Sequence, residues 1–324
     1  MEQLGLFVAA AGFAVVCGLN DGASLVAIGL RGPFVRALRA VCVVAALVVI
    51  APLVVGTAVA RTLTEHLVDF SGDQHARPVL VALLATALVV GTLARRGLPT
   101  SITLALVGSI VGSGVGHGLP TDWGTTARVL TIAIVAPFIG ALAGFSIGRL
   151  SDAIRPRVQR STRVAVTHLT GFGSLAFAYG ANAGQSMIAV WIFATAATGS
   201  STDSSAQIGL LPLIILGLLF GIGTALGLPR LGAPFGSGLI LVRPAQAANA
   251  EISAAAAVLG STAAGSPVSI IQVLTAALIG TGMKDGHHLV RWRRAAKTAL
   301  AWYATFPAAM GLAMCMAWAS SLSS

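Results

Sequence analysis

Two short polar motifs in otherwise apolar stretches hold the residues best suited to binding small ions. Gly18–Ser24 reads Gly-Leu-Asn-Asp-Gly-Ala-Ser, and Gly180–Ser186 reads Gly-Ala-Asn-Ala-Gly-Gln-Ser. The amides of Asn20 and Asn182 can each donate and accept hydrogen bonds. A helix broken at such glycines leaves free N–H groups at one end, which suit an oxyanion, and free C=O groups at the other, which suit a cation. These motifs therefore predict non-covalent ion binding.

A second pair of motifs places hydroxyl groups just after a proline. Ser101 and Thr103 follow Pro99, and Ser269 follows Pro267. Because proline favours the start of a helix, we expect these hydroxyls near helix N-termini, where they and N–H groups can converge on an anion. The alternative is that the small residues only cap helices and let them pack closely.

Asp21 and Glu251 are the two acids that fall clearly within apolar stretches. An ionised carboxylate at membrane depth is costly unless it is paired or hydrated, and no Lys or Arg lies in these stretches. Each acid is therefore expected to meet a cation, a proton or water. The alternatives are that Asp21 caps a half-helix and that Glu251 is protonated or near the interface. His168 is expected at the membrane interface.

The composition indicates that membrane helices position these residues. Apolar residues make up 56% of the 324 and charged residues only 9%, and the mean hydropathy is +0.89. Apolar runs of about 20 residues recur along the chain, as in proteins that cross a membrane several times. The net charge of +10 comes from basic residues in short gaps between these runs, which excludes a nucleic-acid-binding role. Walker A, GxSxG and HExxH motifs are absent, so neither an enzyme nor a cofactor site is predicted.

The sequence predicts an all-α polytopic membrane protein with about ten membrane elements. Two elements are expected to be interrupted, near 18–24 and 180–186. The short elements at 99–117 and 267–283 fit either thin spans or parts of re-entrant hairpins. The predicted elements are 3–30, 40–60, 78–96, 99–117, 126–148, 165–199, 208–228, 245–264, 267–283 and 295–318.

The basic residues predict how the chain is oriented. If the N-terminus is outside and every element crosses once, seventeen of the twenty Lys and Arg residues lie in cytoplasmic gaps. This bias obeys the positive-inside rule, places both termini outside and favours crossing over re-entry for the short elements.

The motifs also indicate an internal duplication. The Asn motif returns after 162 residues, and the Pro-x-Ser motif returns after 168. We expect a first repeat at 1–148, an Arg-rich cytoplasmic linker at 149–164 and a second repeat at 165–324. Since each repeat has five elements, the two enter the membrane from opposite sides. Such inverted repeats are typical of secondary transporters, whose site lies between the repeats.

The duplicated motifs resemble those of the inorganic phosphate transporter (PiT) family. Gly18–Ser24 and its second copy are similar to that family's GANDxxN signature, and the two Pro-x-Ser segments are similar to its GxPxSxTH motif. Glu251 lies eighteen residues before Ser269, as the family's glutamate does. The resemblance covers nearly the whole chain and implies two inverted repeats, a central phosphate and coupling to Na⁺ or H⁺.

The chain departs from the family at several ionisable or amide positions. The second aspartate is Ala183, the last motif residue is Ser24 or Ser186, the first-half counterpart of Glu251 is Leu83, the closing histidine is Leu104 or Gln272, and the histidine before the second motif is Tyr179. Fewer bound cations per cycle are expected, and sulfate becomes an alternative substrate.

Together these features predict a symporter of inorganic phosphate, coupled to Na⁺ or H⁺, in a bacterial-type inner (plasma) membrane. Asp21 is expected to be the first coupling-cation residue and Glu251 the second, while one repeat moves against the other. The residues expected to bind the anion are Asn20, Asn182, Ser101, Thr103 and Ser269. The alternatives are a sulfate or other oxyanion permease, an exporter driven by membrane potential, and a non-transporting subunit or sensor. A homodimer is compatible with the Gly-rich helices.

Overall fold

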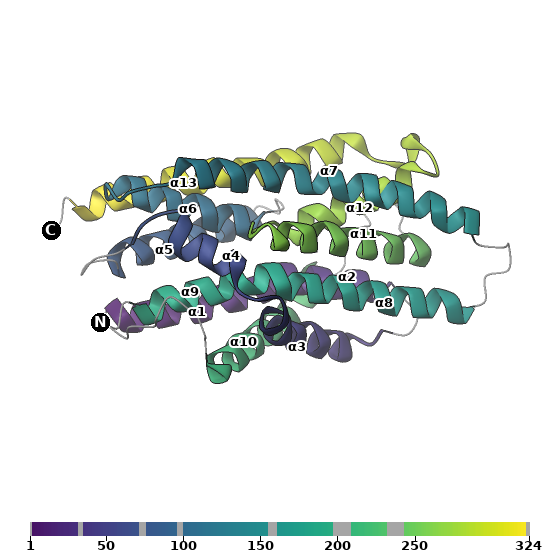
Figure 1. Cartoon of the computed structure of the whole chain (residues 1–324), viewed down its shortest axis with the longest axis horizontal. Helices are drawn as coiled ribbons and strands as arrows, with labels where there is room; N and C mark the ends of the chain where they lie inside the picture. Colours follow the sequence, from purple (N-terminus) through teal and green to yellow (C-terminus); the bar gives the residue numbers. More distant parts are fainter. Residues whose placement is uncertain are drawn as a thin grey trace.

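The computed structural model describes residues 2–31, 35–70, 76–95, 100–154, 161–196, 209–231 and 243–321. Within these ranges the chain is helical, apart from turns and one isolated β-bridge between Val68 and Thr121. Most helices lie roughly along the long axis of the molecule, and α1 begins at the same end at which α13 finishes (Figure 1). The all-α prediction is therefore confirmed for the described residues.

The helices fall close to the predicted elements. The first half contains α1 (Glu2–Cys17), η1 (Gly18–Gly22), α2 (Ala23–Gly29), α3 (Ala37–Val55), α4 (Ala58–Arg61), η2 (Thr62–His66), α5 (Ala76–Arg95), α6 (Ile102–Gly116) and α7 (Trp123–Ile154). The second half contains α8 (Ser161–Tyr179), η3 (Gly180–Gly184), α9 (Gln185–Ala196), α10 (Leu210–Leu231), α11 (Pro244–Ala263), α12 (Ile270–Met283), η4 (His287–Leu289) and α13 (Trp292–Ser321).

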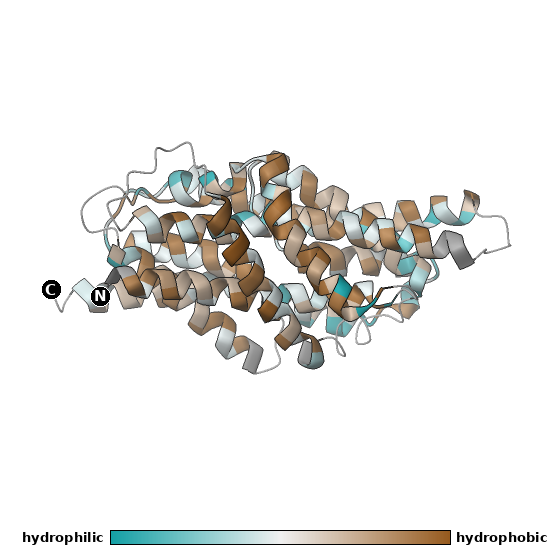
Figure 2. Cartoon of the chain, turned by 90° about the horizontal axis from the view of Figure 1, so that it is seen from below, coloured by the Kyte–Doolittle hydropathy of each residue, from teal (hydrophilic) through white to brown (hydrophobic). Residues whose placement is uncertain are grey.

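The surface between the helix ends is apolar. Within the described ranges, six helical segments are long and apolar enough to cross a membrane, namely Leu4–Gly29, Ala37–Val55, Ala76–Leu93, Trp123–Ile154, Leu210–Pro229 and Trp292–Ser321. Large apolar side chains such as Phe138 and Leu142 on α7 are exposed, as expected for a face covered by lipid. Hydrophilic residues gather mainly toward the ends of the helices (Figure 2). The chain is a multi-pass membrane protein.

The short helices α6 and α12 do not fit the expectation that every element crosses the membrane. They contain 15 and 14 residues. At 1.5 Å per residue each is about 22 Å long, less than the ~30 Å hydrocarbon core. Figure 1 places α5 and α6 in one half of the molecule and α11 and α12 in the other. The two helix pairs form hairpins that lie in opposite halves of the molecule.

The two short helices pack against the long helices of the opposite half. Glycines on α6 face the backbone of α13, and a Cβ atom at Gly112 would overlap the backbone of Met310. In the same way, Gly144 of α7 faces the backbone of Ala277 on α12. Small residues at such crossings let two membrane helices approach closely. The α6–α13 and α12–α7 contacts are thus equivalent, and each joins a helix of one half to a helix of the other.

Two predicted boundaries differ from the structure. The predicted linker 149–164 is helical at both ends, because α7 continues to Ile154 and α8 begins at Ser161; residues 155–160 lie outside the described ranges. The predicted element 40–60 is divided by Gly56, whose φ of +83° belongs to the left-handed region and ends α3.

Candidate functional site

The two Asn motifs form π-helical turns within continuous helices. The prediction that the helices are broken there is therefore wrong. Gly18–Gly22 and Gly180–Gly184 are each one π turn, and the residues that flank them have right-handed helical dihedrals. A π turn adds one residue to the helix yet keeps the backbone hydrogen-bonded, which an apolar surrounding requires. The N–H and C=O groups at these two positions are therefore not free to bind ions, contrary to the expectation from the sequence.

The first π turn carries Asp21 into the interior. Its carboxylate is 6% exposed and accepts a hydrogen bond of 2.8 Å from Nδ2 of Asn20. The hydroxyl of Tyr179, which directly precedes the second π turn, lies beside this carboxylate. The Tyr179 ring in turn packs against Phe220, with ring centroids 5.3 Å apart. Asp21 thus lies where side chains of both halves meet, and no Lys or Arg is among its described neighbours.

In the second π turn, Asn182 holds the α11–α12 turn together. Its Nδ2 donates to Oγ1 of Thr262 and to the carbonyl of Ser266, both at 3.0 Å, and its Oδ1 accepts from the N–H of Val268 at 2.9 Å. The Asn182 side chain is 1% exposed. Because both of its donor hydrogens are used, Asn182 positions the turn that carries Ser269, and its amide is not free for an anion.

The hydroxyls predicted after the two prolines do lie at helix starts. Ser101 is the N-cap of α6 and accepts from the N–H of Leu104 at 3.2 Å. Ser269 is the N-cap residue of α12, but its hydroxyl makes no capping bond. Thr103 reaches across to the second hairpin and donates to the carbonyl of Val268 over a long 3.5 Å.

Val268 joins the candidate anion residues, since Asn182 bonds its N–H and Thr103 its carbonyl. The structure therefore brings Asn182, Ser101, Thr103 and Ser269 to one junction of the two hairpins. Asn20 has no described contact with this junction. It is half-buried and turns its amide to Asp21.

Several buried polar atoms near this junction have no hydrogen-bond partner among the described residues. The most telling is Gln272, in the first turn of α12, whose side chain is 0% exposed while both amide atoms lack a partner. The hydroxyls of Thr100, Ser266 and Thr275 are also unpartnered. A buried polar group left without a partner is destabilising, so such groups mark a place for a polar ligand or water. The sequence signal for Gln272 was its place in the second Pro-x-Ser motif.

Glu251 has a partner that the sequence reasoning missed. Its Oε2 lies 3.0 Å from Nδ1 of His168, and the two side chains are 0% and 1% exposed. His168 is thus buried inside the protein, and its place at the membrane interface stays a prediction. The ring's other nitrogen, Nε2, lies 2.9 Å from the carbonyl of Gly29. The pair joins α8, α11 and the end of α2.

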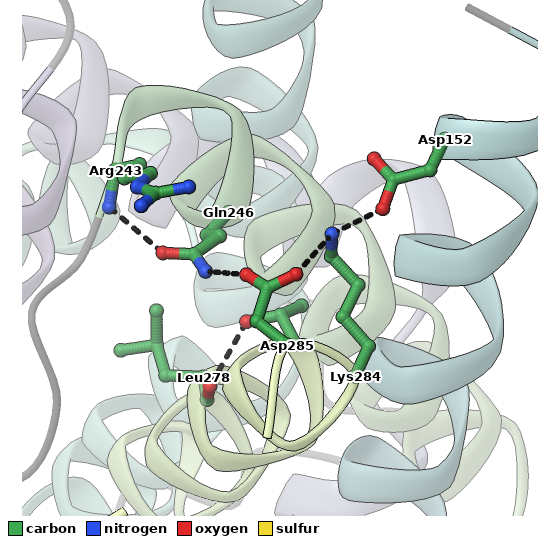
Figure 3. Close-up of polar contacts among 7 residues, drawn as sticks. Asp152, Arg243, Gln246, Leu278, Lys284 and Asp285 are labelled. Carbon is green, nitrogen blue, oxygen red and sulfur yellow. Dashed lines mark hydrogen bonds and ion pairs between the residues drawn. The ribbon is translucent and has the colours of Figure 1, made fainter. Parts of the chain in front are cut away.

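A polar network closes the end of the α11–α12 hairpin (Figure 3). The Lys284 ammonium forms ion pairs with Asp152 and Asp285, and Gln246 links Asp285, at 2.7 Å, to the backbone N–H of Arg243, at 2.9 Å. Partial burial alone would lower the pKa of Lys284, but the two carboxylates raise it above its ordinary value. The network ties α7 to both legs of the hairpin.

Among the described residues no group of three or more His, Cys, Asp or Glu side chains could hold a metal ion. The chemistry that remains at the junction is hydrogen bonding by hydroxyls, amides and helix N-termini. Such groups can bind a tetrahedral oxyanion without forming a covalent bond.

Comparison with known proteins identifies relatives of the whole chain. The model of the PHO4 phosphate transporter family matches residues 17–172 and 154–313. A "Probable low-affinity inorganic phosphate transporter" of Mycobacterium leprae is 29% identical over 262 residues, which cover 78% of this chain and 62% of that protein. A protein of the same name from Rhizobium meliloti is 27% identical over 316 residues, which cover 94% and 92%.

The fold also has a solved counterpart. A structure titled "The sodium-dependent phosphate transporter" matches with a TM-score of 0.82 and 17% sequence identity, and the match covers 99% of both chains. At that identity the match establishes the fold alone. The present chain spans about 62% of the length of the mycobacterial relatives. On the strength of the family match, which extends over most of its length, the chain belongs to the phosphate transporter family.

Proposed function

We propose that the protein is a secondary transporter that carries inorganic phosphate across the membrane together with a cation. The observation that carries this proposal is the junction of the two hairpins, where the N-termini of α6 and α12 meet hydroxyls and a buried amide without partners. Helix N-termini and hydroxyl donors bind phosphate oxygens in many proteins. The family membership and the names of the relatives support the same substrate.

The phosphate would be held by groups from both hairpins. Thr103 and Ser269 supply hydroxyls, and Ser101 supplies the cap that starts α6. Gln272 adds an amide that can donate to a phosphate oxygen. Asn182 acts indirectly by fixing the α11–α12 turn. Asn20 would act through Asp21, to which its amide is bonded.

Asp21 is proposed as the residue that meets the first coupling cation, Na⁺ or H⁺. Its carboxylate is buried, and its described hydrogen bond comes from a neutral amide, so a negative charge there needs compensation. A cation bound beside an oxyanion attracts it, which couples the two ions physically. Glu251, which His168 accompanies, is proposed as the second coupling residue.

The arrangement of two inverted repeats of five elements remains part of this proposal. It is supported by the equivalent α6–α13 and α12–α7 contacts and by the two π turns 162 residues apart. The proposal also places the protein in an inner membrane with both termini outside. The shared end of α1 and α13 in Figure 1 fits termini on one side.

Uptake of radiolabelled phosphate into proteoliposomes tests this function. Imposed Na⁺ and pH gradients are applied separately, and sulfate is added as competitor. We expect one gradient to drive phosphate accumulation that excess sulfate leaves largely unchanged. No gradient-driven uptake of labelled phosphate, together with uptake of labelled sulfate under the same gradient, would instead identify a sulfate permease.

The Asp21→Asn variant tests coupling, because it removes the buried charge with little change of shape. We expect gradient-driven accumulation to be lost while the protein still inserts and folds. Asp122→Asn, which changes an exposed aspartate at the start of α7, is the matched control and should accumulate phosphate like the wild type. Equal accumulation by both variants would contradict the role of Asp21.

A further inference from the structure

The contact between His168 and Glu251 requires a proton. Nε2 of His168 faces the carbonyl of Gly29 at 2.9 Å, and because a carbonyl only accepts, Nε2 carries a hydrogen. Nδ1 faces Oε2 of Glu251 at 3.0 Å. A neutral ring protonated on Nε2 and an ionised carboxylate would present two lone pairs to each other at this distance. One further proton must therefore be present, either on Nδ1 or on the carboxyl group.

Among the described residues, the elements packed against the pair offer no buried charge to hold it together. The elements packed against α8 and α11 include α2, α3, α4, α7, α12 and η3. Of these, α2, α12 and η3 contain no titratable residue. The charged and titratable residues of the others are exposed, namely Arg39, Cys42, Arg61, Arg128, Arg149 and Asp152. The pair is neutral when it holds its proton and has a charge of −1 when it does not. A buried apolar site strongly disfavours the charged form.

The chain is shaped to accept this pair. Gly171 lies one turn from His168, and a Cβ atom there would come 2.7 Å from Oε2 of Glu251 and 3.0 Å from the carbonyl of Ala248. A larger residue would push the carboxylate away from the ring. Neither carboxylate oxygen of Glu251 has a hydrogen-bond partner among the described residues: Oε2 has its 3.0 Å ion-pair contact with Nδ1 of His168, and Oε1 is left as an acceptor for a water or a proton.

The first half lacks the pair altogether. At the repeat offsets of 162 and 168 residues, the counterparts of His168, Gly171 and Glu251 are Leu6, Ala9 and Leu83. Leu6 and Leu83 are both buried in the hydrophobic core, and α1 packs on α5 as α8 packs on α11. The same place in the fold is therefore apolar in one half and proton-binding in the other. A role in holding the fold together does not require this difference.

The pair also lies where a proton could reach it from one end of the molecule. Glu251 follows Gln246 by five residues on α11, which corresponds to about 7.5 Å along the helix. Gln246 belongs to the polar network that closes this end (Figure 3). A proton that leaves the pair would make Nδ1 and the carboxylate repel each other, and α8 would separate from α11.

We propose that His168 and Glu251 form the site of a coupling proton, whose binding joins α8 to α11 and whose release separates them. This inference rests on the proposed phosphate transport and gives H⁺ as one coupling ion. The step is balanced: one proton binds to the pair from one side of the membrane, and the same proton leaves to the other. No bond other than the N–H or O–H bond of the pair forms or breaks.

The Glu251→Gln variant tests the proposal, because glutamine can donate to Nδ1 of His168 but cannot exchange a proton. If one proton accompanies each phosphate monoanion, a gradient of one pH unit supports about a tenfold accumulation. We expect the wild type to approach this ratio in proteoliposomes and Glu251→Gln to show none. Tenfold accumulation by Glu251→Gln would overturn the proposal and leave phosphate transport intact.

Two further measurements test the proposal even if the Glu251→Gln variant does not fold or the purified protein does not transport phosphate. The double variant His168→Leu and Glu251→Leu places leucine at both positions, as in the first half, and it should fold but show no phosphate accumulation in response to a pH gradient. Infrared difference spectra between acidic and alkaline pH are recorded on the purified protein, without transport. We expect carboxyl or imidazole bands that Glu251→Gln lacks, and identical spectra would refute proton exchange. Bands in a wild type that moves no phosphate would refute the transport function but not the proton site.

Discussion

Replacing Asn182 by alanine tests whether this residue holds the α11–α12 turn or binds the substrate. The substitution removes hydrogen bonds to Thr262, Ser266 and Val268, all of 2.9 to 3.0 Å and all buried. A side-chain hydrogen bond within a membrane protein contributes about 0.6 kcal/mol on average and at most about 1.7 kcal/mol. Three such bonds predict a loss of about 2 kcal/mol, rising to about 5 kcal/mol if the backbone groups of Ser266 and Val268 stay dry.

The assay is the melting temperature of the purified protein in detergent, with and without phosphate. We expect Asn182→Ala to melt several degrees below the wild type even without phosphate, because the turn is weakened in the empty protein. Ser253→Ala is the matched control, since Ser253 is equally buried but bonds only within its own helix, to the carbonyl of Asn249. It should melt close to the wild type. If Asn182→Ala melted like the control yet lost phosphate binding, Asn182 would be a direct ligand and our reading of the turn would be wrong.

Three other outcomes follow from local contacts. Hydrogen bonds from the first turn of α7 lower the pKa of Asp122 below its ordinary 3.8. The ionised Asp122 therefore stabilises the protein above that pH, and this contribution is lost as the pH falls through the folded-state pKa. The difference in melting temperature between Asp122→Ala and the wild type should shrink in acid. The pKa of Lys284 is raised above its ordinary 10.5, so its ion pairs stabilise the protein fully below pH 10.5 and are lost as the pH rises through the folded-state pKa. Lys284→Met should therefore lower the melting temperature. This loss should become smaller with added salt and vanish at strongly alkaline pH. A Cβ atom at Gly180 would overlap the backbone of Leu47, so Gly180→Ala should destabilise the protein by about 1–3 kcal/mol and lower the yield of monodisperse protein. Gly173→Ala is the control, because no atom lies within 4 Å of a Cβ atom there, and its yield should be close to that of the wild type.

The sequence located the important segments because glycine, proline and polar residues are rare inside apolar runs. Gly18–Gly22 and Gly180–Gly184 were correctly singled out, as were the helix starts at Ser101 and Ser269. The form of the first two segments could not be read in the same way. A glycine-rich motif fits both an open break and a π turn, and the need to keep backbone groups bonded in an apolar surrounding selected the turn.

The partners of the polar residues were less accessible. Glu251 and His168 are 83 positions apart, and their contact depends on how α8 and α11 are rotated against each other. A usable signal did exist, because His168, Gly171 and Glu251 all replace apolar residues at matching positions of the first half. The role of Asn182 could not be foreseen, since the same amide can bind a ligand or a backbone turn.

The crossed pairing of α6 with α13 and of α7 with α12 has a consequence for how the protein is made. The ribosome synthesises α6 long before α13, so the glycine face of α6 has no permanent partner until the chain is almost complete. The same holds for α7 until α12 has been inserted. We therefore expect late assembly, and a chain cut between residues 154 and 161 should yield two fragments that are unstable alone and regain structure only when they are produced together.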